Sequence, residues 1–273
     1  MKRIRIEKYK GETIEALFSP AIYSPSRYGL SEDLKGRNVK IAIIDSGCPQ
    51  HKDIIVRGEK VTFCDTDKNL YDKTGHSTMV SGIIRSNNKK AIVGLAPHAE
   101  LYFAKIIDEF GKCTFSSMVA AVLWAIVKKV DIILMALGTL YDYSILHNAI
   151  QKAADRGICV ISASNNLIRE NKFIVDFPSK YKEVFSVTSS SGDKNKDKIL
   201  RASVDFILPS EALYTTFLNN KYTKVNGSSI SSAIVCGLVA LLLEKNKKEN
   251  NMSNNMSNNI HKDIHSELLK ILK

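Results

Sequence analysis

The stretch VKIAIIDSG, residues 39–47, runs through apolar and mostly β-branched side chains and then ends in Asp-Ser-Gly. A short apolar run that ends in turn residues indicates a strand buried on both faces, which opens into a loop at its carboxyl end. Asp45 is the last residue of that strand, where a buried carboxylate is costly unless another group is paired with it. The stretch therefore predicts both a central strand and a polar site at its end.

Further strands and helices alternate along the rest of the chain. Strands are predicted at 99–108, 131–138, 158–166 and 183–190, and helices at 77–86, 116–129, 143–157, 229–245 and 260–272. Strands separated by helices of ten or more residues indicate an α/β fold with a mainly parallel sheet, covered by helices on both faces. Such sheets carry their chemistry beyond the carboxyl ends of the strands, where Asp45, Gly138 and Asn165 fall here.

One domain accounts for most of the chain. A polar N-terminal extension, residues 1–37, precedes it, and the domain itself is predicted to span residues 38–273. Within that domain the low-complexity segment KNKKENNMSNNMSNN, residues 245–259, is expected to be a flexible linker before the C-terminal helix.

The 273 residues carry 39 Lys and Arg against 28 Asp and Glu, a net charge of +11. The basic residues are scattered and form no stripe interleaved with aromatic residues, so we expect no nucleic-acid partner. No apolar run approaches the ~18 residues of a membrane span, and the basic N-terminus lacks the apolar core of a signal peptide. We therefore expect a cytoplasmic protein without a membrane partner, and the sequence leaves its oligomeric state open.

Cysteine and histidine spacing argues against a disulfide framework and against a metal site. The five cysteines are an odd number without Cys-x-x-Cys spacing, and several lie inside apolar runs; they are Cys48, Cys64, Cys113, Cys159 and Cys236. His261 and His265 stand one helical turn apart, a spacing that a metal ion can use, but no third ligand lies nearby in the sequence. We expect neither a metal ion nor a cofactor.

Four serines in five positions follow an Asn-Gly turn in the stretch KVNGSSISSAIVCG, residues 224–237. Serine at a helix start is usually a cap, and the local sequence alone favours that interpretation. Acyl transfer by serine would require a base, a carboxylate that orients the base, and donors for the oxyanion. Asp45, His76 and Asn165 are candidates for these roles, although each alone is better explained as a turn, cap or loop residue.

Six motifs in register make the chain resemble the subtilisin-like serine peptidases, the subtilases, over residues 39–243. The motifs are IAIIDSG, GHSTMVSGII, AIVGLAPHAELYFAKI, DIILMALG, VISASNN and NGSSISSAIVCG. The chain order Asp, His, Ser is also the order found in subtilisin. The resemblance implies a small intracellular member of the family with the three-layer αβα subtilisin-like fold.

The resemblance also implies four chemical roles. Asp45 would orient His76, and His76 would act as the general base that deprotonates the nucleophile Ser229. Asn165 would donate a hydrogen bond to the oxyanion. Ser228 would fill the family's threonine position before the nucleophile, and Ser231 and Ser232 are expected to be ordinary residues of the first helical turn.

A peptide substrate in this family lies extended beside an edge strand and a Leu-Gly segment, a β-augmentation mode. By resemblance, Gly111, Lys112 and Cys113 form the edge strand, and Ala136, Leu137, Gly138 and Ser164 form the segment and the pocket wall. Ser164 stands where the family has glycine, so we expect it to narrow or polarise the pocket. The acidic residues Asp108 and Glu109 are more simply explained as a solvated turn than as a site for basic substrate side chains.

The segment RSNNKKAIVG, residues 85–94, lies where many secreted subtilases bind calcium through a loop. Here it is short and carries Lys89 and Lys90. Calcium requires oxygen ligands and net negative charge, so we expect no calcium there and interpret Asp53 as a surface or cap residue.

We expect an intracellular serine endopeptidase that makes limited cuts in a precursor, for example removing the leader of a ribosomally made, lantibiotic-type peptide. This expectation rests on the small size, the missing export signal and the altered pocket. The 37 residues before the core are also too few for the folded pro-domain of secreted subtilases. Two alternatives stay open: general intracellular protein turnover, and a catalytically silent subtilase fold that binds peptides or regulates a partner.

Overall fold

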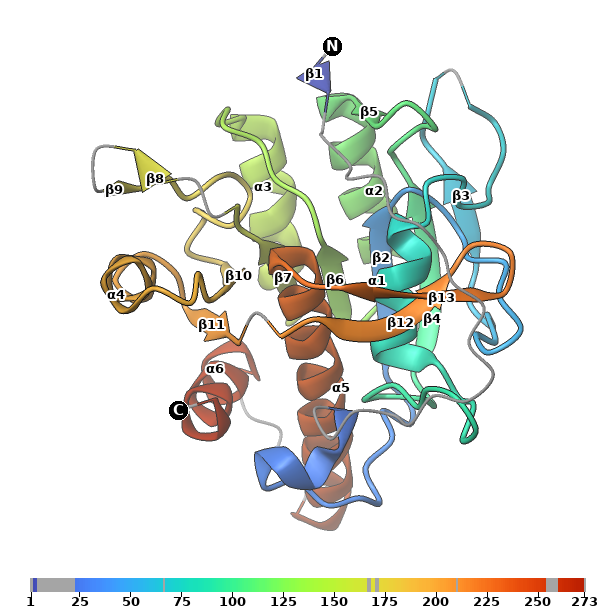
Figure 1. Ribbon diagram of the computed structural model, residues 1–273, viewed down its shortest axis with the longest axis vertical. Coiled ribbons are helices and arrows are strands. Elements are labelled where there is room, and N and C mark those ends of the chain that lie inside the picture. The colour runs from blue at the N-terminus through green and yellow to red at the C-terminus, as the bar shows by residue number, and fades with distance from the viewer. Residues whose placement is uncertain are drawn as a thin grey trace.

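Seven parallel strands form the central sheet of the protein (Figure 1). The computed structural model describes residues 2–3, 23–65, 67–165, 168–169, 172–209, 211–253 and 260–272. In chain order the strands are β2 (Lys40–Asp45), β3 (Lys60–Thr62), β4 (Glu100–Lys105), β6 (Ile132–Met135), β7 (Cys159–Ala163), β10 (Val184–Ser189) and β11 (Phe206–Leu208). Their order across the sheet is β11-β10-β7-β6-β2-β4-β3, and every neighbouring pair is parallel.

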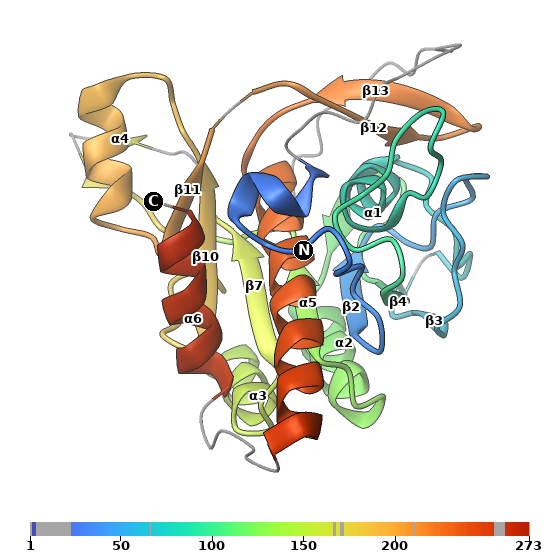
Figure 2. The same cartoon turned by 90° about the horizontal axis from the view of Figure 1, so that it is seen from below.

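Helices cover both faces of this sheet (Figure 2). One layer contains α1 (His76–Arg85), α5 (Ser228–Ser253) and α6 (Ile260–Ile271), and the other contains α2 (Phe115–Val127) and α3 (Ser144–Ala154). Successive side chains of a strand point to opposite faces, so Ile41 and Ile43 pack with the first layer, and Ala42 and Ile44 with the second. The predicted three-layer αβα fold is therefore confirmed.

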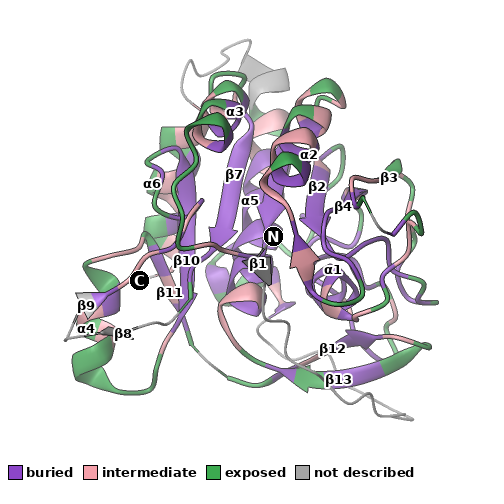
Figure 3. Ribbon diagram, turned by 90° about the horizontal axis from the view of Figure 1, so that it is seen from above, coloured by how far each residue is buried: buried purple, intermediate pink, exposed green. Residues whose placement is uncertain are grey.

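Burial on both faces explains why the strands are short and continuously apolar. β2, β7 and β10 lie almost wholly inside the molecule (Figure 3). Parallel strands of this kind are sandwiched between helices, so they do not alternate between apolar and polar side chains.

An antiparallel hairpin, β12 (Leu213–Phe217) and β13 (Lys221–Val225), crosses the outside of α1 and leads into α5 (Figure 1). The Thr215 and Thr216 hydroxyls donate to the carbonyls of Met79 and Thr78 at 2.7 and 2.8 Å. Gly82 permits this close packing, because a Cβ there would lie 2.2 Å from the Thr216 Oγ1. The sequence analysis did not identify this hairpin, which ties together the helices that begin with His76 and Ser228.

Smaller elements complete the described chain. They are β1 (Lys2–Arg3), the 3-10 helix η2 (Pro25–Tyr28), β5 (Lys112–Cys113), β8 (Ile168–Arg169), β9 (Lys172–Phe173) and α4 (Lys194–Arg201). β5 lies where the sequence predicted an edge strand, and β1 pairs with it in the antiparallel direction.

The core helix α5 is longer than predicted. It runs to Ser253, so residues 245–253 of the expected linker are helical, and the prediction of a flexible connector is wrong for them; residues 254–259 lie outside the described part. Lys245 and Lys247 form ion pairs with Glu267 and Asp131, which attach this extension to the domain.

By length and composition α5 is also apolar enough to cross a membrane, with a mean hydropathy of 1.5 in the most apolar 18-residue window of Ser228–Glu249. However, 83% of the most apolar window is buried inside the protein. Contacts with α1 and with β6, β7 and β10 account for this burial, so the apolar surface of α5 forms part of the core of the domain.

Part of the predicted N-terminal extension packs against this domain. Tyr23, Tyr28 and Leu34 are buried, and the Tyr23 hydroxyl donates to the Tyr214 carbonyl at 2.9 Å. The Glu244 carboxylate of α5 accepts the backbone N–H groups of residues 35, 36 and 37 at 2.7, 2.7 and 3.0 Å. Residues 23–37 are therefore attached to the domain, whereas residues 4–22 lie outside the described ranges.

Candidate active site

Asp45 and His76 meet at the carboxyl end of β2. The Nδ1 atom of His76 lies 2.9 Å from both carboxylate oxygens of Asp45, and the Asp45 side chain is 1% exposed. The backbone N–H of Ser46 also donates to the Asp45 Oδ1 at 2.6 Å. A carboxylate that accepts from Nδ1 fixes the imidazole tautomer and leaves Nε2 unprotonated, so it can accept a proton.

A second buried carboxylate, Asp72, organises the loop that precedes His76. Its Oδ1 accepts from the backbone N–H groups of Thr74 and Gly75 at 2.9 Å, and its Oδ2 accepts from the N–H and hydroxyl of Thr78 at 2.9 and 2.7 Å. The Ser46 hydroxyl donates to Asp72 as well, at 2.9 Å. Asp72 thus satisfies the Thr78 N–H in the first turn of α1 and connects the start of the helix to the loop after β2. The sequence analysis missed this residue.

Three influences set the pKa of His76. Burial lowers it, whereas the charge and hydrogen bond of Asp45 and the charge of Asp72 raise it, and the net result lies above the ordinary value. The two carboxylates therefore favour the imidazolium that forms when His76 takes up a proton.

Ser229 lies in the first turn of α5 and is half-buried. Its hydroxyl donates to the carbonyl of Ala136 at 3.0 Å, and its own carbonyl accepts from the Ser232 hydroxyl at 2.8 Å. Within the described chain no hydrogen bond joins it to His76. Ser231 and Ser232 are buried first-turn residues, as expected.

Asn165 follows β7 and is exposed, as expected for a loop residue at the end of a strand. Its side-chain amide donates to the Oδ2 of Asp176 at 2.6 Å, and its backbone N–H donates to the Oδ1 of the same residue at 3.3 Å. Asp176 is 1% exposed, and the sequence analysis did not identify it. Its position next to Asn165 depends on a contact between segments that are separate in the sequence.

The predicted substrate segments lie at two places in the fold. Ala136 and Leu137 are buried just after β6, and their carbonyls accept from the hydroxyls of Ser229 and Ser162. Gly138 follows and faces Asp176, since a Cβ built on it would lie 2.0 Å from the Asp176 Oδ2. Ser164, the residue in place of glycine, is fully buried.

The predicted edge strand, Gly111 to Cys113, has its pairing positions occupied by the chain itself. Lys2 is opposite Cys113, and Arg3 is opposite Lys112, in antiparallel register. This edge is therefore already paired with a strand of the same chain.

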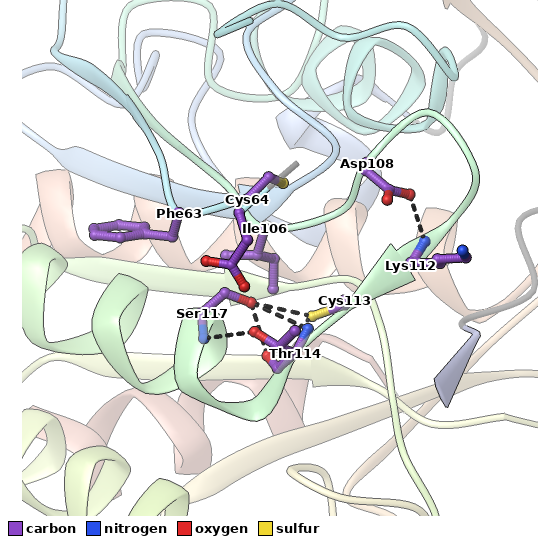
Figure 4. Close-up of a pocket in the computed structure, with 9 residues that line it drawn as sticks. Phe63, Cys64, Ile106, Asp108, Lys112, Cys113, Thr114 and Ser117 are labelled. Atoms are coloured by element: carbon purple, nitrogen blue, oxygen red, sulfur yellow. Dashed lines mark hydrogen bonds between the residues drawn. The ribbon is translucent and has the colours of Figure 1, made fainter. Parts of the chain in front are cut away.

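A small hollow lies behind β5 (Figure 4). Its lining residues are Phe63, Cys64, Asp65, Ile106, Asp108, Lys112, Cys113, Thr114 and Ser117. The volume open to the centres of water molecules is about 10 Å³, enough for about one water and too little for a substrate side chain.

The two acidic residues before β5, Asp108 and Glu109, stabilise the turn that leads into this strand. Asp108 accepts the backbone N–H groups of Phe110 and Lys112 at 2.9 and 2.8 Å, and Glu109 lies 3.5 Å from the Lys73 ammonium. This supports the interpretation of these residues as a turn.

The residues near the family's calcium loop do not fit a calcium ion. Asp53 is buried, so the expectation of a surface residue is wrong; it accepts hydrogen bonds from the Asn88 amide, at 3.0 Å, and from the Tyr222 hydroxyl. Lys89 and Lys90 are exposed in the same loop. The Asp53 carboxylate thus accepts hydrogen bonds from neutral donors, and the charged side chains in the adjacent loop are positive, whereas calcium requires oxygen ligands and net negative charge.

The two histidines of the C-terminal helix have protein partners. His261 Nε2 is 3.1 Å from the Glu183 carbonyl, and His265 Nε2 is 3.3 Å from the Asp205 Oδ1. Both rings also contact Phe185. These contacts give the histidines a packing role.

Comparison with known proteins agrees with this arrangement. Residues 36–266 match the family model described as the subtilase family. The chain is 34% identical over 219 residues to the minor extracellular protease Epr of Bacillus subtilis (strain 168), a match that covers 78% of this chain and 33% of that protein. It is 32% identical over 220 residues to subtilisin DY of Bacillus licheniformis, covering 79% of this chain and 80% of that protein. Against subtilisin BL of Lederbergia lenta the identity is 29% over 216 residues, with coverages of 78% and 79%. The chain belongs to the subtilase family and is a subtilisin-like serine endopeptidase.

Proposed function

We propose that His76 deprotonates Ser229 as it attacks a peptide carbonyl, and that Asp45 holds the imidazole and stabilises its protonated form. The observation that carries this proposal is the double contact between His76 Nδ1 and the buried Asp45 carboxylate. His76 then returns the proton to the leaving amine, and water hydrolyses the acyl-enzyme by the same steps.

Two side chains must change partners for this chemistry. Ser229 donates to the Ala136 carbonyl, and a change of its rotamer redirects the hydroxyl toward His76. Asn165 donates to Asp176, and its amide must turn to the substrate oxygen to act as oxyanion donor. Catalytic hydrogen bonds often tighten only when substrate is bound.

We propose that the substrate binds as an extended strand against β5 and the segment after β6. The antiparallel pairing of Lys2 and Arg3 with β5 supports this mode, because a peptide backbone already pairs with the same edge, and a substrate must displace these residues to bind there.

We further propose limited cleavage of a precursor inside the cell, such as removal of the leader of a lantibiotic-type peptide. Five buried free thiols favour a reducing compartment. Ser164 and Asp176, both buried beside the substrate segment, favour a narrow choice of substrate over general digestion.

Serine replacement tests the catalytic assignment. Ser229→Ala should lose peptide hydrolysis by a factor on the order of 10⁶ and lose labelling by a fluorophosphonate. Ser231→Ala and Ser232→Ala, one turn or less away, should keep both. If Ser231→Ala were the inactive variant, the assignment of Ser229 would be wrong. No labelling of the folded wild-type protein would instead support a silent, peptide-binding role.

The breadth of cleavage tests the proposed biological role. We expect little degradation of casein and a single cut in a lantibiotic-type precursor, read by mass spectrometry. Extensive casein digestion at many positions would favour general intracellular protein turnover.

A further inference from the structure

Asp176 is a buried carboxylate without a charged partner. Its side chain receives two hydrogen bonds from Asn165, and no Lys, Arg or His in the described ranges forms an ion pair with it. Burial raises the pKa of Asp176 to about 6, while contacts with Ser164 and Asn165 oppose the rise. A carboxylate held this way is stabilised less well than one that contacts a cation.

Contacts among three separate segments of the chain place the Asp176 carboxylate beside the predicted substrate segment after β6. Thr139 and Phe177 exchange backbone hydrogen bonds of 2.8 and 2.7 Å, which hold the segment after β6 against the segment that contains Asp176. The Asp176 Oδ2 occupies the space that a side chain at Gly138 would need. Asn165 contributes the third segment.

This position relates Asp176 to one particular substrate residue. The oxyanion donor binds the carbonyl of the residue that precedes the scissile bond, so a group in contact with Asn165 lies beside that residue's side chain. A lysine or arginine there brings a cation on a long, flexible stem. Asp108 and Glu109 do not compete for this cation, since their carboxylates serve the turn and Lys73.

We infer that Asp176 is a specificity-determining residue, which selects substrates with lysine or arginine directly before the scissile bond and releases the Asn165 amide when that cation binds. This inference rests on the proposed roles of Ser229 and Asn165. Asn165 is exposed and Asp176 is buried beneath it, so the amide must move for the carboxylate to meet a substrate. The same movement frees the amide for the oxyanion, and the preferred side chain thereby completes the catalytic site.

Matched peptides that differ only in the residue before the cut test this inference. Wild-type enzyme should cleave arginine and lysine peptides with a kcat/KM roughly 30- to 1000-fold above that for glutamine or leucine, the range for a desolvated charge pair. Asp176→Asn should remove most of this preference. Asp176→Ser, which also frees Asn165, should raise kcat for the leucine peptide.

A charge-matched control separates selection from general electrostatics and from folding. Asp155→Asn removes one negative charge at the exposed C-terminal end of α3 and should leave the preference unchanged. Thermal melting shows whether each variant is folded. If Asp176→Asn lowered cleavage of all peptides equally, or if wild type favoured leucine over arginine, the inference would be overturned.

A binding measurement tests Asp176 without turnover. In the Ser229→Ala background, a peptide that ends in arginine should bind more tightly than one that ends in leucine, and Asp176→Asn should abolish the difference. Equal binding of the two peptides would refute the role of Asp176. Failed fluorophosphonate labelling of wild type would instead refute the role of Ser229.

Discussion

At the scale of a single residue, the pKa of His76 is determined by two opposing effects. Burial disfavours its charged form, and the carboxylates of Asp45 and Asp72 favour it, with the carboxylates prevailing. A base that is easily protonated stabilises the imidazolium in the transition state, but it loses activity at low pH because it is already protonated.

The pH profile follows from the sign of this shift. Because the pKa of His76 lies above its ordinary 6.5, kcat/KM should fall as the pH is lowered, with a midpoint above 6.5. The profile should be measured on Asp176→Asn with a leucine peptide, which removes the second titrating carboxyl from the site. A midpoint below 6.5 would contradict the dominance of the carboxylates.

Asp176 shows which site residues a single sequence reveals. Asp45, His76, Asn165 and Ser229 stand in recognisable motifs, since each occurs beside turn or helix-start residues that its position requires. Asp176 carries no local signal, because its position depends on the contact of its segment with Asn165 and Gly138. The engagement of Asn165 by a carboxylate was equally inaccessible from the sequence.

At the scale of elements, the start of α1 depends on one side chain. Asp72 accepts hydrogen bonds from the loop before the helix, from its first turn and from Ser46. These contacts fix where α1 begins and therefore where the His76 ring lies relative to Asp45.

Asp72→Ala should destabilise the protein by about 2–4 kcal/mol, because buried N–H donors lose their acceptor. It should also move the midpoint of the pH profile downward, since Asp72 helps to raise the pKa of His76. Urea unfolding and the pH dependence of kcat/KM measure the two effects. A loss of stability with an unmoved midpoint would limit Asp72 to a structural role.

The elements themselves were predictable where burial is strong. The apolar runs of β2, β6 and β7 and the helices between them were found, because a doubly covered sheet imposes a simple pattern. The hairpin β12–β13 was missed because its short strands mix threonine, lysine and aromatic residues. Its signal was the Asn219-Asn220 pair, whose positive φ angles of 59° and 58° suit a tight hairpin turn.

At the scale of the whole molecule, Glu244 joins the core helix α5 to the segment that precedes β2. It lies in α5 and accepts the backbone N–H groups of residues 35–37, together with the side chains of Arg37 and Lys248. Burial alone would raise its pKa, but these hydrogen bonds lower the pKa of Glu244 to about 2.

The sign of this shift gives a prediction for acid stability. Because the pKa of Glu244 is lower in the folded protein than in the unfolded chain, its carboxylate stabilises the fold at pH values above the unfolded pKa of 4.5. This stabilisation is lost as the pH falls from 4.5 toward 2. Glu244→Gln should lower the free energy of unfolding by about 1.5–3 kcal/mol at pH 7. The free energy of unfolding of this variant should also depend less on pH between 4.5 and 2. The exposed Glu211→Gln is the control, and equal unfolding curves for both variants would contradict this account.

With Ser229 as the proposed nucleophile, its position in α5 also determines when activity can arise during synthesis. β2 and α1 can bring Asp45 and His76 together early, but the proposed nucleophile is added only by a helix that follows every strand of the central sheet. Domains fold from the N-terminus as the chain emerges. Peptidase activity is therefore among the last properties that the growing chain acquires, and incomplete chains cannot cut themselves or their neighbours.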